Sequence, residues 1–373
     1  MKKYLFFLLL TTCSFPKQHV FDNRWIDDYE NIPLDFKIGQ MLMLGFYGSD
    51  VNEEIRHYIE DLHIGGVVLF NRSNPQERAN IISPDQVKKL NQELQDLAYV
   101  KLFISVDEEG GKVARLNSNN GFYTPPSPKE LGEKNDTNIT YHESRKIAEM
   151  LKKYGFNWNY VPTVDVDINA ENPIIGKLGR AFSADPVVVA DQAYAFVLGH
   201  QDEGIITSLK HFPGHGSSVE DSHEDLVDIT KTYDKIELYP YEELIKKGYN
   251  ETVLVGHLID RRIDQKYPAS LSQNFIQKML RQDLGFQGVV ITDDLNMGAI
   301  NGQKLSLEEI LVSVINAGVD IVMYANNLGP YYKDFADDAV SLVRKNVENG
   351  KISQDAIDQA YLRVMRLKKE KLY

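Results

Sequence analysis

Short, continuous apolar runs alternate with amphipathic segments along most of the chain. A strand buried on both faces, as in a parallel sheet, has an unbroken apolar run, whereas a half-buried strand alternates apolar with polar residues. The runs therefore predict the strands of a parallel sheet. We expect these strands at residues 40–46, 66–70, 102–107, 159–166, 205–211, 252–257, 288–293 and 320–325.

The segments between the runs have apolar residues at helical spacing, which predicts helices that cover the sheet. Gly155 and Gly204 closely follow two of these segments, as glycines that end helices do. The polar stretch 117–138 is expected to be a long loop. The predicted helices span residues 84–99, 141–154, 186–203, 272–284, 306–317, 331–349 and 353–369.

Eight strands with helices between them predict an α/β fold, a (β/α)8 barrel of the TIM type. We expect it to form a single domain over residues 21–373. A doubly wound sheet, the alternative, requires a glycine fingerprint for phosphate after an early strand. Neither Gly65-Gly66 nor Gly110-Gly111 supplies that fingerprint, so the barrel is the expected fold.

Composition and charge exclude two classes of protein. The chain of 373 residues is 43% hydrophobic, which is too much for general disorder. It has 54 acidic against 41 basic residues, for a net charge of −13. Phosphate binding requires a basic surface, so nucleic acid is not expected as a partner.

The first residues have the order of an export signal. Residues 1–3 (MKK) are positively charged, and the apolar run 4–10 is too short to cross a bilayer as a helix. A buried N-terminal strand is the alternative. Cys13, the only cysteine, resembles the lipidated cysteine of a bacterial lipobox, although Thr12 stands where Gly, Ala or Ser is usual. We expect residues 1–20 to be a signal peptide or lipoprotein signal of an exported bacterial protein, which is periplasmic or membrane-anchored through lipidated Cys13.

In a barrel of this type, catalytic groups come from the carboxyl ends of the strands and the loops after them. Ionisable residues, which are seldom buried without a reason, stand at the ends of the third to seventh predicted strands. Adjacent side chains on an extended strand point to opposite faces, so one of the two acids that end the seventh strand should face the site. The strand-end residues are Asp107, Asp165, Asp167, Lys210, His211, His257, Asp293 and Asp294.

The segment 210–226 follows the fifth strand and contains three of the nine histidines. Pro213 and the glycines beside it exclude a helix, so these histidines are expected on a loop. Asp221 and His223 are two residues apart. On a turn, the carboxylate can fix the tautomer of the imidazole and raise its basicity, as a general acid/base requires. A metal site and a set of structural histidines are the alternatives.

These motifs together resemble glycoside hydrolase family 3, in its bacterial β-N-acetylglucosaminidase branch. The segment 210–216 (KHFPGHG), followed by 221–223 (DSH), is the long and specific part of the resemblance. Shorter similarities occur at 106–113 (VDEEGGKV), at 172–186 (NP, GRAF and DP) and at 292–297 (TDDLNM), and the match runs from about residue 39 to residue 325.

The resemblance implies a retaining exo-β-N-acetylhexosaminidase that removes terminal β-linked N-acetylglucosamine from glycans such as peptidoglycan or chitin fragments. Asp293 would attack the anomeric carbon and form a covalent glycosyl intermediate. His223 would protonate the leaving oxygen and then deprotonate water, while Asp221 orients His223. No metal or cofactor is implied. The residues implied to hold the sugar are Asp107, Arg115, Arg180, Lys210 and His211.

Four other activities are compatible with the residues. A neutral histidine adds no negative charge beside the nucleophile, so phosphate can attack in place of water and the chain would be a β-N-acetylglucosaminide phosphorylase. A β-glucosidase of the same family is the second alternative, and a non-catalytic glycan-binding lipoprotein is the third. A metal-dependent barrel hydrolase, the fourth, would use His211, His215, His257 and Asp293.

Overall fold

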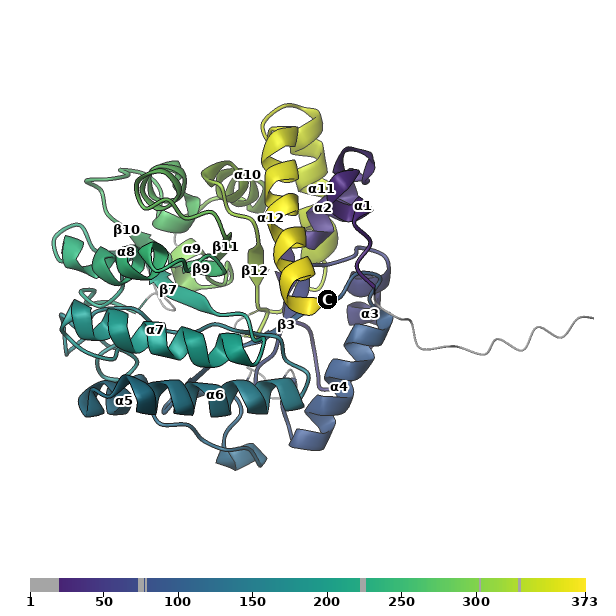
Figure 1. Cartoon of the computed structure of the whole chain (residues 1–373). Coiled ribbons are helices and arrows are strands. Elements are labelled where there is room, and N and C mark those ends of the chain that lie inside the picture. The colour runs from purple at the N-terminus through teal and green to yellow at the C-terminus, as the bar shows by residue number, and fades with distance from the viewer. Residues whose placement is uncertain (1–19, 73–76, 78, 222–225, 302, 328–329) are drawn as a thin grey trace, which may run out of the picture.

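The computed structural model describes residues 20–72, 77, 79–221, 226–301, 303–327 and 330–373. Within these residues, eight parallel strands form a closed ring (Figure 1). Isolated bridges close the ring, at Trp158–Ile206 and Thr163–Lys210 between β6 and β7 and at Ile291–Ile321 between β11 and β12. The predicted barrel is confirmed. Its strands are, in order, β1 (Leu42–Leu44), β2 (Gly66–Val68), β3 (Phe103–Val106), β6 (Trp158–Asn159), β7 (Ser208–Phe212), β9 (Thr252–Val255), β11 (Val289–Thr292) and β12 (Val322–Tyr324).

Helices cover the outside of the barrel, as the sequence pattern predicts (Figure 1). The larger ones are α2 (Leu34–Gln40), α3 (Glu53–Glu60), α4 (Pro84–Leu97), α6 (Thr137–Lys153), α7 (Pro186–Asp202), α8 (Tyr239–Lys246), the π-helical segment η6 (Asn274–Asp283), α10 (Leu307–Ala317), α11 (Phe335–Glu348) and α12 (Gln354–Leu372). Shorter elements are α1 (Arg24–Asp27), η1 (Tyr29–Asn31), η3 (Ser118–Asn120), α5 (Pro128–Lys134), η4 (Lys235–Leu238), η5 (Ala269–Leu271), α9 (Gly298–Asn301) and the strand pairs β4 (Glu108–Gly110) with β5 (Val113–Ala114) and β8 (Val227–Asp228) with β10 (Leu258–Ile259).

The fourth strand is much shorter than predicted. The prediction of 159–166 is wrong after Asn159, because the amide of Val161 binds the carbonyl of Asn159 instead of a neighbouring strand and Pro162 has no N–H group with which to resume the ladder. Beyond it, only Thr163 pairs with the next strand, through an isolated bridge to Lys210. The irregular backbone brings Asp165 next to β7, where it contacts His211.

The helix predictions are wrong in two places. The stretch 117–138 is not all loop, because Ser127 and Glu130 form a capping box that starts α5. The prediction also omits α2, which has 7 residues, and α3 and α8, which have 8 residues each; all three are too short for a clear helical period. Gly155 and Gly204 have positive φ angles of 84° and 76°, as expected of glycines that end helices.

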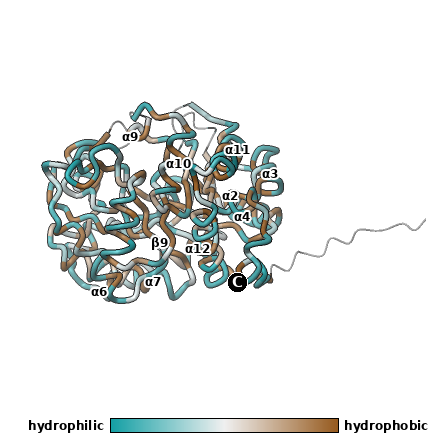
Figure 2. Tube along the Cα trace, turned by 90° about the horizontal axis from the view of Figure 1, so that it is seen from above, coloured by the Kyte–Doolittle hydropathy of each residue, from teal (hydrophilic) through white to brown (hydrophobic). Residues whose placement is uncertain are grey.

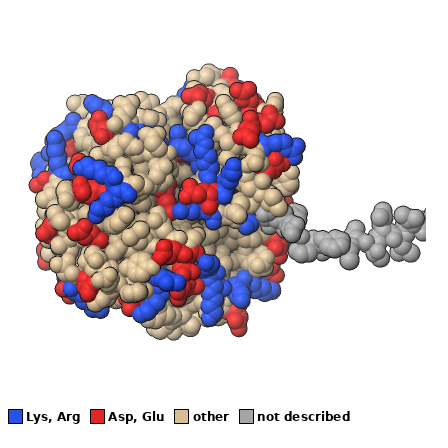
Figure 3. All heavy atoms as spheres, viewed as in Figure 1, with Lys and Arg blue, Asp and Glu red and all other residues tan. Residues whose placement is uncertain are grey.

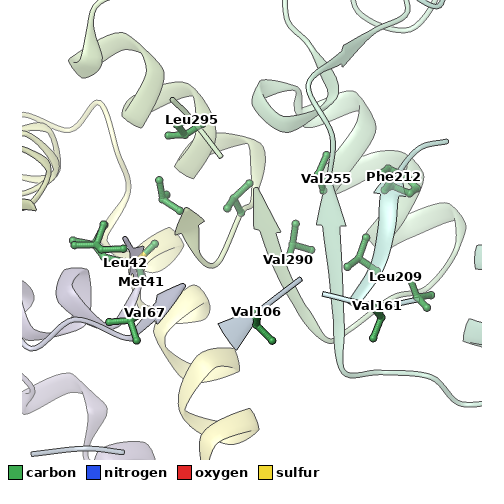
Figure 4. Close-up of a cluster of buried hydrophobic side chains, with 14 of the residues drawn as sticks. Met41, Leu42, Val67, Val106, Val161, Leu209, Phe212, Val255, Val290 and Leu295 are labelled. Carbon is green, nitrogen blue, oxygen red and sulfur yellow. The ribbon is translucent and has the colours of Figure 1, made fainter. Parts of the chain in front are cut away.

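The apolar core lies between the barrel and its helices. The most hydrophobic segments occupy the middle of the molecule and hydrophilic segments its rim (Figure 2). Figure 4 shows part of this core, to which neighbouring strands around the barrel contribute buried side chains. Those labelled on strands include Val67, Val106, Leu209, Val255 and Val290.

The last helix closes the amino-terminal end of the barrel. Four residues that lie one or two positions before a strand bind the carboxyl-terminal half of α12 by hydrogen bonds or ion pairs. Val364, Leu367 and Leu372 of this helix join the cluster of side chains that includes the strand residues Met43 and Phe103. The four polar contacts are Arg363–Asp320, Lys368–Gln40, Lys371–Glu251 and Lys101–Leu372. We call this end of the barrel its base.

The first described residues also pack on the base. Trp25 stacks on Phe36 of α2 with ring centroids 4.9 Å apart and an interplanar angle of 3°. Phe21 contacts Tyr373 at the end of the chain, edge to face. These residues belong to an apolar cluster that includes Tyr361 of α12. The amino-terminal segment is therefore fixed to the end of the barrel where the strands begin.

Lys368 lies in this base, and no acidic side chain in the described part of the chain pairs with it. Its side chain is fully buried, its Nζ donates to Gln40 Oε1 over 2.7 Å, and burial lowers its pKa well below the usual range. We expect Lys368→Met to raise the free energy of unfolding by about 1 kcal/mol. A base whose pKa falls on folding loses stability as the pH is lowered, so the gain should be larger at pH 6 than at pH 9. Thermal unfolding of this variant and of Lys369→Met, an exposed neighbour, would test it; equal shifts in both variants would contradict the prediction.

The surface carries acidic and basic side chains in a mixed distribution on the face that Figure 3 shows. None of the helices in the described ranges is both long and apolar enough to cross a membrane.

Candidate active site

A cavity of about 620 Å³ opens at the carboxyl ends of the strands. The five residues predicted to hold the sugar line it together with Asp293, although they come from four different strand ends and from the loops after them. The loops after β2 and β5 add polar side chains, and Leu254 and Met323 form part of its apolar surface. Its polar lining includes Asn71, Arg72, Asp107, Lys112, Arg115, Arg180, Lys210, His211 and Asp293.

Glu109 organises the cations of this cavity from below. It accepts two hydrogen bonds of 2.8 Å from Arg180, at Nε and Nη2, and its Oε1 lies 2.6 Å from Lys210 Nζ. Burial raises the pKa of Glu109, but Arg180 and Lys210 outweigh burial and hold this pKa well below its usual range. The carboxylate is therefore ionised, and it fixes both cations with little freedom to move.

Asp107 is the acid that faces the cavity from the third strand end. Lys210 Nζ lies 2.8 Å from its Oδ1, and Arg115 Nη2 lies 3.5 Å from its Oδ2. Burial raises the pKa of Asp107, but Lys210 and Arg115 together lower it below the usual value. An ionised carboxylate beside fixed cations can accept a hydrogen bond from one sugar hydroxyl while the cations donate to the next.

His211 is neutral, as its partners require. Its Nδ1 lies 2.7 Å from Asp165 Oδ2, and its Nε2 lies 3.1 Å from Arg180 Nη2. A guanidinium only donates, so Nε2 accepts and the ring proton is on Nδ1, where it is donated to Asp165. His211 therefore holds Arg180 against the cavity. Its direct contact with a sugar stays a prediction.

The two adjacent acids after β11 have different positions, as expected. Asp293 lines the cavity, and its Oδ1 accepts the amide of Asp294 over 2.9 Å. Asp294 Oδ1 instead accepts the amides of Asn296 and Ala325, over 3.0 and 2.8 Å. Asp294 thus connects the end of β11 to the end of β12, whereas Asp293 faces the cavity.

The predicted acid/base pair is described only in part. Asp221 is half-buried on the loop after β7, and His223 lies outside the described residues. Their expected hydrogen bond, and the roles of Asp221 and His223, stay predictions.

The metal-site alternative receives no support from the described histidines. His215 Nδ1 lies 2.6 Å from Ser218 Oγ. His257 is buried, donates from Nε2 to the carbonyl of Asp294 and contacts Ser270 Oγ through Nδ1. No group of three or more His, Cys, Asp and Glu side chains in the described part of the chain is arranged to hold a metal ion.

The sequence alone assigns no role to four polar residues of the site. Glu109 lies in the motif 106–113, but its partners are 71 and 101 residues away in the chain. Asp165 was noted only as a strand-end acid. Asn71 and Arg72 follow β2 directly, which is the one signal that could have indicated them.

Comparison with known proteins identifies the family. Residues 33–367 match the profile of the glycosyl hydrolase family 3 N-terminal domain. The chain belongs to glycosyl hydrolase family 3. Among curated relatives, a β-hexosaminidase of Nitrosomonas eutropha is 32% identical over 334 residues, which cover 87% of this chain and 88% of the relative.

Solved family 3 structures agree with this assignment. A family 3 β-N-acetylglucosaminidase from Paenibacillus sp. str. FPU-7 superposes with a TM-score of 0.83 at 34% identity, over 91% of this chain. This chain spans 63% of that protein. A β-N-acetylhexosaminidase from Beutenbergia cavernae gives a TM-score of 0.81 at 27% identity, over 91% of this chain and 99% of the other. Membership of family 3 makes the chain a glycoside hydrolase.

Proposed function

We propose that the chain is a retaining exo-β-N-acetylhexosaminidase that removes terminal β-linked N-acetylglucosamine from glycans. One observation carries this proposal: Asp293 lines the same cavity as Asp107, Arg180 and Lys210, whose charged groups are fixed by buried partners. A carboxylate at the carboxyl end of a barrel strand, facing an array of hydroxyl-binding groups, suits attack on a sugar held in one orientation.

The reaction has two steps in this proposal. Asp293 attacks the anomeric carbon while His223 donates a proton to the leaving oxygen, which forms a glycosyl–aspartate ester. His223 then removes a proton from water, and the water attacks the same carbon and releases Asp293. Asp221 orients His223 during both transfers. Two inversions leave the anomeric configuration unchanged.

A panel of nitrophenyl glycosides tests the proposed activity. We expect the fastest release from the N-acetyl-β-glucosaminide, with the β-anomer of the sugar as the first product in an NMR time course. Faster release from the β-glucoside would favour the β-glucosidase alternative. Binding of N-acetylglucosaminides without release would favour a non-catalytic glycan-binding protein.

The acid/base role is tested by His223→Ala. We expect kcat to fall by about 100-fold or more on a substrate with a poor, alkyl leaving group, because protonation of that group is needed for departure. An activated dinitrophenyl substrate leaves without protonation, so its first step should change little. Brønsted plots of both proteins measure the difference; equal losses on both substrates would mean that His223 is not the acid.

Phosphorolysis is a second candidate, because cations outnumber acids around the cavity. A phosphate ion entering in place of water would meet this positive charge. The same panel with added phosphate separates the two activities, since a phosphorylase would release the sugar 1-phosphate. The lining contains the cations Arg72, Lys112, Arg115, Arg180 and Lys210 against the acids Asp107 and Asp293.

We also propose that the protein is exported and acts on a glycan outside the cytoplasm, such as a peptidoglycan fragment. The support is in the sequence, where residues 1–3 and the apolar run 4–10 have the order of an export signal. Cys13 is the proposed lipidation site. Mass spectrometry of the mature amino terminus tests both, and Cys13→Ser should release an anchored protein from membranes.

A further inference from the structure

The backbone after β7 is held by two buried carboxylates. On one side, Asp165 Oδ1 accepts the amides of His211 and His215, over 3.2 and 2.8 Å. On the other side, Glu237 Oε2 accepts the amides of Gly216 and Ser217, over 2.8 and 3.3 Å. Asp165 also contacts His211, which holds Arg180. Glu237 has no role in the reaction described above.

Glu237 packs directly beneath this backbone. It lies in η4, which begins at the capping residue Asp234, and it is fully buried. A Cβ atom on Gly214 would come within 2.6 Å of Glu237 Cβ, so the loop can approach this closely only with glycine there. The close contact therefore depends on Gly214 in the loop after β7 and on Glu237 in η4.

The surroundings of Glu237 disfavour a negative charge. Three titratable groups face it: Asp165 from the loop after β6, Tyr233 from the segment between β8 and η4, and Tyr241 of α8. In the described part of the chain, no Lys or Arg pairs with Glu237. Burial raises the pKa of Glu237 to about 7, and hydrogen bonds from Ser217 and Gly216 offset this only in part.

This environment makes the ionised form costly for folding. An acid whose pKa rises on folding contributes stability that is full below its unfolded value and is lost as the pH rises through the folded value. Ionised Glu237 therefore destabilises the protein above about pH 7.

We propose that Glu237, as a carboxylate, is a positioning residue that holds the Gly216–Ser217 backbone and so aligns the segment that leads to Asp221 and His223. The proposal rests on the hydrolase function described above. A carboxylate accepts both amides strongly, whereas an acid or amide side chain at this place offers a weaker acceptor. The segment would thus be aligned above about pH 7 and would loosen as the pH falls.

Glu237→Gln tests this role. At pH 8 we expect kcat on an alkyl N-acetyl-β-glucosaminide to fall by about 10-fold to 100-fold, because a small misplacement of a catalytic group has costs of this order. KM for the same substrate should change by less than about threefold. The melting temperature at pH 8 should stay equal or rise. The loss should shrink below pH 6, since the wild-type carboxyl group is then protonated as well.

Hydrogen exchange gives a readout that does not depend on activity. At a single pH of 8, the peptide that contains Gly216 and Ser217 should exchange faster in Glu237→Gln, while peptides of β11 stay unchanged. The matched control is Glu243→Gln on α8, whose carboxylate pairs with Lys246 at the surface and should affect neither measurement.

Three results would overturn the proposal: equal protection of that peptide in both proteins, pH profiles of the same shape, or an activity loss that parallels a lower melting temperature. A wild-type protein without glycosidase activity would instead contradict the proposed function. In that case the exchange experiment would still show whether Glu237 holds the two amides.

Discussion

Asp293→Ala is expected to lower the turnover of an aryl N-acetyl-β-glucosaminide by roughly three orders of magnitude or more, because the glycosyl–enzyme intermediate can no longer form. The rest of the site is expected to stay intact, because buried Glu109 fixes Arg180 and Lys210. Initial rates and the binding constant of N-acetylglucosamine measure the two effects separately.

A small external nucleophile should restore part of the loss. With azide and an activated aryl substrate, Asp293→Ala has room for the anion on the face that the carboxylate leaves. The expected product is the α-glycosyl azide, formed by a single inversion. Recovery with the β-configuration would mean that another group forms the covalent intermediate.

Asp294→Asn is the matched control for this prediction. Asparagine keeps an oxygen that can accept the amides of Asn296 and Ala325, and Asp294 does not line the cavity. We therefore expect its kcat to stay within about tenfold of the wild type. If Asp294→Asn loses as much activity as Asp293→Ala, the nucleophile has been assigned to the wrong member of the pair.

Glu109→Gln is expected to cost about 3 to 5 kcal/mol of unfolding free energy, because it leaves buried Arg180 without its ion-pair partner and leaves Lys210 with Asp107 alone. Both cations line the cavity, so KM should rise as well. The pKa of Glu109 is depressed, so its contribution to stability is present above the usual value of 4.5 and is lost as the pH falls. The deficit should therefore be largest near neutral pH and shrink in acid, as denaturant titrations at several pH values would show.

Glu108 provides the control for this variant. It is also fully buried, but burial raises its pKa well above the usual range, and its Oε2 accepts the amide of Leu116. A carboxyl group that is already neutral resembles glutamine, so Glu108→Gln should cost about 1 kcal/mol or less. Similar losses in the two variants would contradict the assignment of charge to Glu109.

The barrel and most of its cavity could be predicted from the sequence for physical reasons. Parallel strands buried on both faces leave continuous apolar runs, and the ionisable residues that interrupt the pattern stand where strands end. Asp107, Lys210 and Asp293 were predicted in this way, and all three line one cavity. The family motifs added Arg115 and Arg180, which the apolar pattern does not indicate.

Other parts depend on contacts that a linear pattern does not contain. The pairing of Glu109 with Lys210 joins residues 101 positions apart. Glu237 binds backbone amides, so the residue types of its partners do not indicate the contact. The neutral state of His211 follows only from the guanidinium beside its Nε2. The short fourth strand reflects a local hydrogen bond from the amide of Val161 to the carbonyl of Asn159, together with the missing N–H group of Pro162.

If Cys13 is lipidated as we propose, the attachment of Phe21 and Trp25 to the base would place this end of the barrel near the membrane. Six residues separate Cys13 from Val20, and extended chain covers at most about 3.6 Å per residue, so a lipid on Cys13 would keep the base within about 25 Å of the bilayer. The strands run from the base to the cavity, so the cavity would open away from the membrane. Such an enzyme would bind polymer that approaches from the cell wall. The head groups of the membrane that anchors it would lie on the side of the base, opposite the cavity.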